Sequence, residues 1–215
     1  MHAPLPRPRA TRRADARRME ILRAAARVFR ERGFAEAGMR EIAAEADLSP
    51  GILYHYFAGK HEILYFCQDR SLDRMLAAVE SARASAAPAA EKLRAILVSH
   101  VHCLLDDVEG SVAHLAVEAL PNDLRERIVA KRDRYERAIR SLIAEGIARR
   151  ELASAADPSL VTRAILGALN WTARWFRPGG QRDAAAVADE LANYLVNGLD
   201  TPSQRRRRAK TSRIR

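Results

Sequence analysis

The residues best suited to chemistry lie between positions 39 and 60, where polar side chains interrupt an apolar pattern. Arg40 and Lys60 are cationic, and Tyr54, His55 and Tyr56 are consecutive polar aromatic residues. An arginine offers the paired donors that match a guanine edge, whereas lysine and tyrosine suit phosphate oxygens. This combination predicts that the segment binds a nucleic acid.

Two short helices joined by a tight turn are expected to position these side chains. Ile42 and Ala43 share one face of the first helix, and Ser49 followed by Pro50 is typical of the start of the second. Because helices of about two turns are not stable alone, they must pack on a neighbour. That neighbour is expected from near Asp15 to Gly33, with an apolar face of Ile21, Leu22, Ala25, Val28 and Phe29. The arrangement is a helix-turn-helix, whose second helix presents its first turn to the major groove of DNA.

The order of motifs in residues 21–66 resembles the DNA-binding domain of the TetR family of bacterial transcriptional regulators. The motifs are F-x-E-R-G-F, M-R-E-I-A, S-P-G-I-L-Y-H-Y-F and K-H-E-I-L. The resemblance implies a DNA-binding set of Arg40, Ser49, Pro50, Gly51, Ile52, Tyr54, His55, Tyr56 and Lys60. Within this set, Tyr54 and Lys60 match phosphate contacts, and the side chains placed to distinguish bases are Arg40, Ile52, His55 and Tyr56.

Two tyrosines of this segment have an alternative interpretation, and two other residues depart from the family pattern. Tyr54 and Tyr56 could be core aromatics, but tyrosines two positions apart cannot share one helix face. Gly38 stands where a Ser or Thr usually caps the first short helix, at a cost of about a few tenths of a kcal/mol. Asp47 replaces the usual turn glycine, and aspartate tolerates left-handed backbone geometry better than most residues.

The whole sequence predicts an all-α fold of about nine helices. Its 215 residues are rich in Ala, Leu, Arg and Glu, and no stretch alternates apolar and polar residues with a period of two. Six later helices are expected. One covers residues 60–85, one begins at Pro88, a short one ends at Leu120, and a long one begins at Pro121. The last two cover Pro158–Phe176 and Asp183–Asn197. The expected domains are a disordered basic arm (1–13), the helix-turn-helix domain (14–62), a ligand-binding and dimerisation domain (63–199) and a disordered Arg-rich tail (200–215).

The net charge of +10 is concentrated at the two ends of the chain. Residues 1–18 carry a net charge of +5 and residues 205–215 one of +7, which leaves −2 for the rest. Clustered arginines suit a DNA backbone through counterion release, with a solubilising tail or an anionic membrane surface as alternatives. Neither a signal peptide nor an apolar run near 20 residues occurs, and Cys67 and Cys103 form no disulfide framework. We therefore expect a cytoplasmic, nucleoid-associated bacterial protein with no membrane partner.

The last two helices are expected to form a homodimer, as the family resemblance implies. Small residues there permit close packing, and aromatic and branched residues would fill the seam. The expected interface is Ala164, Gly167, Ala168, Trp171, Trp175, Val187, Leu191, Tyr194 and Leu195. A two-fold dimer places its recognition helices one turn of DNA apart, which predicts a palindromic double-stranded operator.

The segment from Gly167 to Gly180 resembles a signature of TetR-type regulators of lipid and sterol catabolism, many of which respond to acyl-CoA thioesters. Arginines could meet the CoA phosphates and a tryptophan could stack on adenine. The expected ligand-binding set is His100, Cys103, Leu104, His114, Trp171, Arg174, Trp175 and Arg177. Alternatively, both tryptophans pack in the dimer seam and Arg174 meets a carboxylate.

Neither a metal site nor an enzyme is expected. The central His/Cys group consists of His100, His102, Cys103 and His114. Only His100 and Cys103 share a helix face, so a pocket lined by ordinary histidines is a simpler interpretation than a metal site. The sequence has no nucleophile with a paired base and no phosphate-cradling glycine loop, and we expect no cofactor.

These observations favour a ligand-released transcriptional repressor, with an acyl-CoA thioester as the ligand. A repressor of an efflux or stress operon that senses a hydrophobic, drug-like molecule is the first alternative. The second is a ligand-independent architectural DNA-binding protein driven by the arginine tails, which would show a steep salt dependence and little sequence preference.

Overall fold

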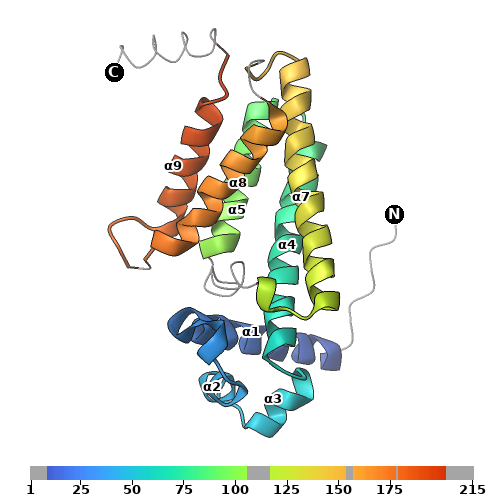
Figure 1. Ribbon diagram of the computed structural model, residues 1–215, viewed down its shortest axis with the longest axis vertical. Coiled ribbons are helices and arrows are strands. Elements are labelled where there is room, and N and C mark those ends of the chain that lie inside the picture. Colours follow the sequence, from blue (N-terminus) through green and yellow to red (C-terminus); the bar gives the residue numbers. More distant parts are fainter. Residues whose placement is uncertain (1–8, 106–116, 154–156, 178, 202–215) are drawn as a thin grey trace. The chain divides into compact units, whose positions relative to one another are not determined.

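The computed structural model describes residues 9–105, 117–153, 157–177 and 179–201, and the side chains from residue 13 onward within those ranges. Every regular element in these ranges is a helix, so the all-α prediction is confirmed (Figure 1). The elements are α1 (Arg9–Glu36), α2 (Met39–Glu45), α3 (Pro50–Tyr56), α4 (Lys60–Ala84), α5 (Ala89–Leu105), the 3-10 turn η1 (Val117–Ala119), α7 (Asn122–Ala148), α8 (Pro158–Trp175) and α9 (Ala184–Asn197).

Helix α1 starts earlier than the sequence suggested. It begins at Arg9, not near Asp15, so residues 9–13 of the expected disordered arm are helical. The physical reason is that the A-T-R-R-A-D-A stretch is rich in good helix formers, and a proline directly before a helix favours its start. The expected end at Gly33 is marked by a positive φ of 77°, a conformation that favours glycine, before a last short helical stretch to Glu36.

The chain divides into two compact units. The first comprises residues 1–69 and 106–125, and the second comprises residues 70–105 and 126–215. Helix α4 is continuous from Lys60 to Ala84 and therefore contributes residues to both units.

The first unit is built on an apolar core supplied by its three N-terminal helices and the start of α4. Burying such side chains stabilises the fold by roughly 1.5–3 kcal/mol each, which two-turn helices such as α2 and α3 need. The fully buried members with the largest side chains are Ile21, Phe29, Ile42, Leu53, Phe57, Ile63 and Leu64.

The second unit is organised around α5, which packs against α8 and α9 (Figure 1). The buried face of α5 includes Leu93, Ile96, Leu97, Val101 and Leu104. Arg94 adds a polar link, because its guanidinium donates to Asp189 Oδ1 (2.8 Å) and Asn193 Oδ1 (2.7 Å) on α9. Close packing of α7 on the start of α5 depends on Gly146, where a Cβ would lie 2.7 Å from that of Ala89.

Candidate DNA interface and ligand-binding domain

The start of α3 is held by the cap that the sequence predicted. Ser49 has an extended backbone, and its hydroxyl accepts a hydrogen bond from the Ile52 amide at 3.4 Å, while Pro50 occupies the first turn. Asp47 in the preceding turn has a φ of 52°, the left-handed geometry expected where a glycine is usual. The cap of α3 and the turn before it are therefore both formed by residues close in sequence.

Helix α3 has one buried and one exposed face. Leu53 and the following Phe57 are buried, whereas Ile52 is 48% and Tyr54 is 55% exposed. The exposure of Tyr54 excludes the interpretation of this side chain as a core aromatic. A Cβ built on Gly51 meets no atom within 4 Å, so the first turn of α3 is open to an approaching surface.

Three other predicted DNA-binding side chains lie near this face or at the start of α2. His55 is exposed, Tyr56 is half-buried, and their rings contact each other edge to face with centroids 5.8 Å apart. Arg40 is exposed in the first turn of α2. The cap of that helix, Gly38, provides no side-chain hydrogen bond, and the Glu41 carboxylate fills the space that a Cβ there would need.

Lys60 is bound to its own unit at the start of α4, and its predicted phosphate contact stays a prediction. Its ammonium donates to the carbonyl oxygens of Phe34 (3.0 Å), Ala35 (2.9 Å) and Ala37 (3.0 Å), and lies 4.9 Å from the centre of the Phe34 ring. An ammonium has three N–H donors, and all three are used by these carbonyls. The sequence motif could not foresee this convergence of three carbonyls on the lysine.

His100 is a buried polar residue of the second unit that has a partner on each ring nitrogen. Its Nδ1 lies 3.1 Å from the Tyr135 hydroxyl and its Nε2 lies 3.1 Å from Asn170 Oδ1, which joins α5, α7 and α8. Burial lowers the pKa of His100 to about 4, although the hydrogen bond with Asn170 acts in the opposite direction. Burial likewise raises the pKa of Tyr135. A neutral imidazole that donates from Nε2 and accepts at Nδ1 satisfies every partner in this cluster.

The other residues of the predicted ligand set lie in three different environments. Cys103 and Leu104 are buried in the core beside His100, and His114 lies outside the described residues. Trp171 is 61% exposed and Trp175 is also exposed. The structure therefore does not bring the whole predicted set together in one cavity.

Near the end of α8 the predicted cations are exposed. The Arg174 guanidinium lies 5.7 Å from the centre of the Trp171 ring, an arrangement typical of a cation–π contact. Arg177 closes the last turn of α8, because its Nη1 donates to the carbonyls of Arg174 (3.2 Å) and Phe176 (3.1 Å).

The predicted dimer residues also divide by exposure. Tyr194 is 77% exposed, Leu191 and Leu195 are half-buried, and the small residues Ala164, Gly167 and Ala168 are exposed on α8. Leu160, which we did not predict, extends that stripe with 67% exposure and could have been found from its helical spacing to Ala164. The prediction that Val187 lies in the dimer interface is wrong. Its side chain is only 4% exposed and belongs to the core of its own chain, because this part of α9 faces inward.

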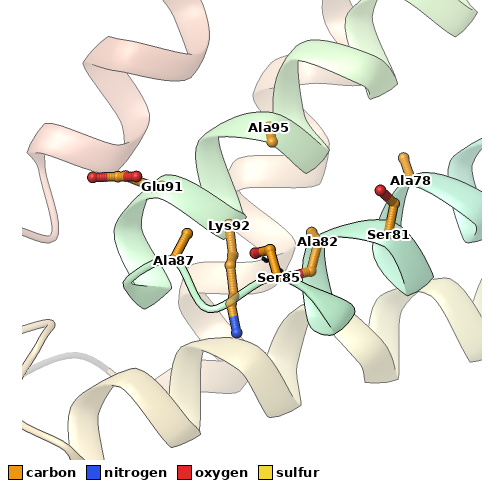
Figure 2. A pocket seen from close by; sticks show the side chains of 8 residues that line it. All are labelled: Ala78, Ser81, Ala82, Ser85, Ala87, Glu91, Lys92 and Ala95. Atoms are coloured by element: carbon orange, nitrogen blue, oxygen red, sulfur yellow. Dashed lines mark hydrogen bonds between the residues drawn. The ribbon is translucent and has the colours of Figure 1, made fainter.

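A cavity of about 460 Å³ lies where α4 ends and α5 begins, a volume within the range of small-molecule sites (Figure 2). Figure 2 shows Lys92 extending past Ser85, while Glu91 points away from it. The lining residues are Ala78, Ser81, Ala82, Ser85, Ala87, Glu91, Lys92 and Ala95, none of them in the predicted ligand set. The only sequence signal is the Ala- and Ser-rich composition of residues 77–90.

Two further observations concern only the described ranges. No group of three or more His, Cys, Asp or Glu side chains within them could hold a metal ion. None of their helices combines the length and apolarity that crossing a bilayer requires.

A capped helix that exposes its first turn, carried by a three-helix unit and followed by a larger helical unit, defines a DNA-binding regulator of the helix-turn-helix class. The chain belongs to the TetR family. Residues 21–65 match the N-terminal domain described as bacterial regulatory proteins of the tetR family, and residues 86–199 match the tetracyclin repressor-like C-terminal domain. Members of this family bind operator DNA as dimers and are not enzymes.

Three relatives match nearly the whole length of the chain. The transcriptional repressor KstR2 of Mycobacterium tuberculosis is 28% identical over 191 residues, which cover 86% of this chain and 94% of KstR2. Its solved structure has a TM-score of 0.78 at 26% identity, covering 86% of this chain and 95% of that one. The fatty acid metabolism regulator protein of Bacillus subtilis is 26% identical, covering 84% and 94%. The structure of PfmR from Thermus thermophilus has a TM-score of 0.75 at 32% identity, covering 84% and 99%.

Proposed function

We propose that this chain is a transcriptional repressor that leaves its operator when an acyl-CoA thioester binds the second unit. The observation that carries the proposal is the full-length similarity to KstR2, named as a ketosteroid regulator and repressor, and to a fatty acid metabolism regulator. Both similarities cover at least 84% of this chain and therefore include the helices of the second unit. Control of lipid or sterol catabolism is the role that both names suggest.

The exposed end of α8 provides groups suited to the CoA moiety. The Arg174 guanidinium can form paired hydrogen bonds with a phosphate, and it is already positioned on the Trp171 ring. Trp171 and Trp175 expose indole surface on which an adenine can stack. We assign the phosphate contact to Arg174, because Arg177 uses one of its nitrogens to close the end of the helix.

The His100 cluster is connected to the same helix through Asn170, an exposed residue on the same face as Arg174. Asn170, which binds His100, is one helical turn before Arg174. A ligand that moved this turn would strain three hydrogen-bonded helices at once. A ligand that prefers the non-binding conformation by about 3 kcal/mol would lower operator affinity by up to roughly a hundredfold.

The test is a titration of the operator complex at fixed salt with CoA thioesters of short, medium and long acids and of a steroid acid. Free CoA and the free acids are the controls. We expect a thioester to release the DNA and the matching free acid to have no effect. The variant Arg174→Gln should require roughly tenfold more thioester, which corresponds to about 1.4 kcal/mol. The control variant Arg163→Gln, at another exposed arginine of α8, should respond as the wild type does.

Tight binding that no thioester disturbs would refute the proposed ligand and leave the DNA-binding function standing. Hydrophobic, drug-like molecules would then be the next effectors to test.

A further inference from the structure

The first helix begins twelve residues before the range that matches the family. Residues 21–65 match the N-terminal domain of TetR regulators, whereas α1 begins at Arg9. Residues 9–20 are called the α1 extension below. At a rise of about 1.5 Å per residue, they form roughly 18 Å of helix. The matched domain does not account for this segment, so its role must follow from its own residues and contacts.

The α1 extension is strongly basic. It contains two acids, Asp15 and Glu20, against five arginines, which are Arg9, Arg12, Arg13, Arg17 and Arg18. Arg13 is exposed, and no hydrogen bond or ion pair links its guanidinium to the residues that the structure describes. Clustered arginines attract a polyanion, so the position of the segment decides which polyanion it meets.

Two arginines place the α1 extension beside the end of the recognition helix α3. The Arg18 guanidinium lies 5.9 Å from the centre of the ring of Phe57, the residue that caps the end of α3. Arg17 pairs with Glu20 and also interacts electrostatically with Tyr56, the last residue of α3. The extension therefore adjoins the helix that presents its first turn to the major groove.

The rest of α1 shows in which direction the extension runs. Nine residues after Arg18, Arg27 pairs with Glu45 in the last turn of α2. Followed back toward its N-terminus, α1 therefore passes α2 first and the end of α3 next (Figure 1). Arg13 precedes Arg17 by one helical turn on the same face, so it lies beyond the end of the α2–α3 pair.

A guanidinium in this position suits the phosphate backbone of DNA. When α3 lies in the major groove, the strands that border the groove carry phosphates, and an element beside the end of α3 meets those phosphates and not the base edges. Arginine binds a phosphate through paired, charge-assisted hydrogen bonds. Arg18 keeps this ability, because a ring contact uses the face of the guanidinium and leaves its in-plane N–H donors available.

We propose that the α1 extension is a second DNA-binding element, a basic helix that contacts backbone phosphates outside the base pairs read by α3. The contact with the end of α3 favours DNA over the other roles of clustered arginines, which are binding to an anionic membrane surface and solubilisation. Such a contact lengthens the DNA that the protein covers and does not depend on the identity of the effector, so it goes beyond the proposed function. Because a helix holds its charges in fixed positions, the phosphate contacts should lie at a defined distance from each half-site.

The experiment measures binding of the wild-type dimer to two duplexes over a range of salt concentrations. Both carry the inverted repeat that the wild-type protein selects from a randomised pool. One duplex ends at the repeat, and the other continues on each side for one helical turn, roughly 10 base pairs. We expect the longer duplex to bind roughly tenfold more tightly, because each subunit gains charge-assisted phosphate contacts.

Two variants separate the charge of the α1 extension from its helical structure. Arg13→Gln should reduce the slope of log affinity against log salt on the longer duplex by about 1.8, or 0.9 for each subunit, and leave the shorter duplex unaffected. Ala14→Pro keeps every charge but starts the helix at residue 14, since proline lacks the amide donor and suits a first helical position. It should also lose most of the preference for the longer duplex, because the residues before it are no longer held in place.

The matched control is Arg137→Gln, which removes the same charge from an exposed arginine of α7 and should keep the wild-type preference. Each variant is compared with itself on two duplexes, so a partly unfolded population lowers both affinities by the same factor and leaves their ratio unchanged. Equal binding of both duplexes by the wild type would overturn the proposal, and Arg13-dependent binding to phosphatidylserine vesicles would then assign the extension to a membrane surface. An unchanged preference in Ala14→Pro would also overturn it, because a flexible basic arm would then suffice.

Discussion

Gly51 shows at the scale of one residue how α3 is adapted to a large, rigid partner. Its missing side chain leaves the first turn of the helix open, because a Cβ at this position would meet no atom within 4 Å. Gly51→Leu should leave stability equal or higher, because leucine is the better helix former by up to about 1 kcal/mol. Operator affinity should fall at least about tenfold, because the new side chain separates the backbone from the groove. Gly51→Ala should give an intermediate loss, and unchanged binding by both variants would refute the contact.

His100 is the residue whose protonation should affect stability most directly. Its pKa is about 4 in the folded chain, below the usual value of 6.5, so the unfolded chain binds more protons between these two pH values. The free energy of unfolding should therefore fall as the pH falls from 6.5 to 4, by up to roughly 3 kcal/mol, and this component should not decrease further below pH 4.

Denaturant unfolding of wild type and His100→Gln at pH 7, 6, 5 and 4 measures this component. The difference between the two proteins should shrink as the pH falls. The control His102→Gln removes an imidazole from the same helix and leaves the His100 partners intact. A constant difference between wild type and His100→Gln would show that His100 does not carry the pH dependence.

Residue roles were predictable where they depend on near neighbours in the sequence. Ser49 caps α3 as expected, and Asp157 caps α8, a residue type and position typical of a helix start; both contacts span three residues or fewer. The contacts of Lys60 and His100 were not predictable, because their partners lie 23 to 26 and 35 to 70 positions away in the chain. Val187 was misplaced because two apolar faces of α9 could not be ranked from its sequence.

At the scale of elements, helix ends marked by proline, glycine or a capping residue were the most predictable feature. Helices α4, α8 and α9 begin and end within about two residues of the expected positions. Helix α1 was expected from near Asp15, a residue type common at helix starts, so the charged part before it was taken for disorder although its composition favours a helix.

Gly146 makes packing between elements testable. An alanine normally stabilises a helix over glycine by about 1 kcal/mol, but a Cβ here would lie 2.7 Å from Ala89 Cβ and 2.8 Å from Leu152 Cδ1. Overpacking typically costs about 1–3 kcal/mol, so Gly146→Ala should have the lower unfolding free energy despite its better helix propensity. The control Ala144→Gly, on the exposed side of α7, measures the propensity term alone. A more stable Gly146→Ala would mean that α7 and α5 pack less closely.

At the scale of the whole molecule, we propose that the exposed apolar faces of α8 and α9 form the interface of the dimer, the state in which TetR regulators act. We expect Leu160→Asp and Tyr194→Asp each to raise the dimer dissociation constant at least about tenfold, because a carboxylate would be buried without a partner. Sedimentation or light scattering of the purified variants measures the change. Val129→Asp, at an exposed apolar residue of α7, is the control and should remain dimeric. If only the control variant Val129→Asp became monomeric, the interface would lie outside the exposed faces of α8 and α9.

The measurement that tests the central claim most directly is selection of DNA by the wild-type protein from a randomised pool, followed by footprinting and determination of stoichiometry. A dimer that presents two copies of α3 should select an inverted repeat. Its half-sites should be centred about one helical turn, roughly 10 base pairs, apart, with one dimer per repeat. Sequence-indifferent binding with a steep salt dependence would contradict recognition through α3 and point to an architectural protein driven by its arginine tails.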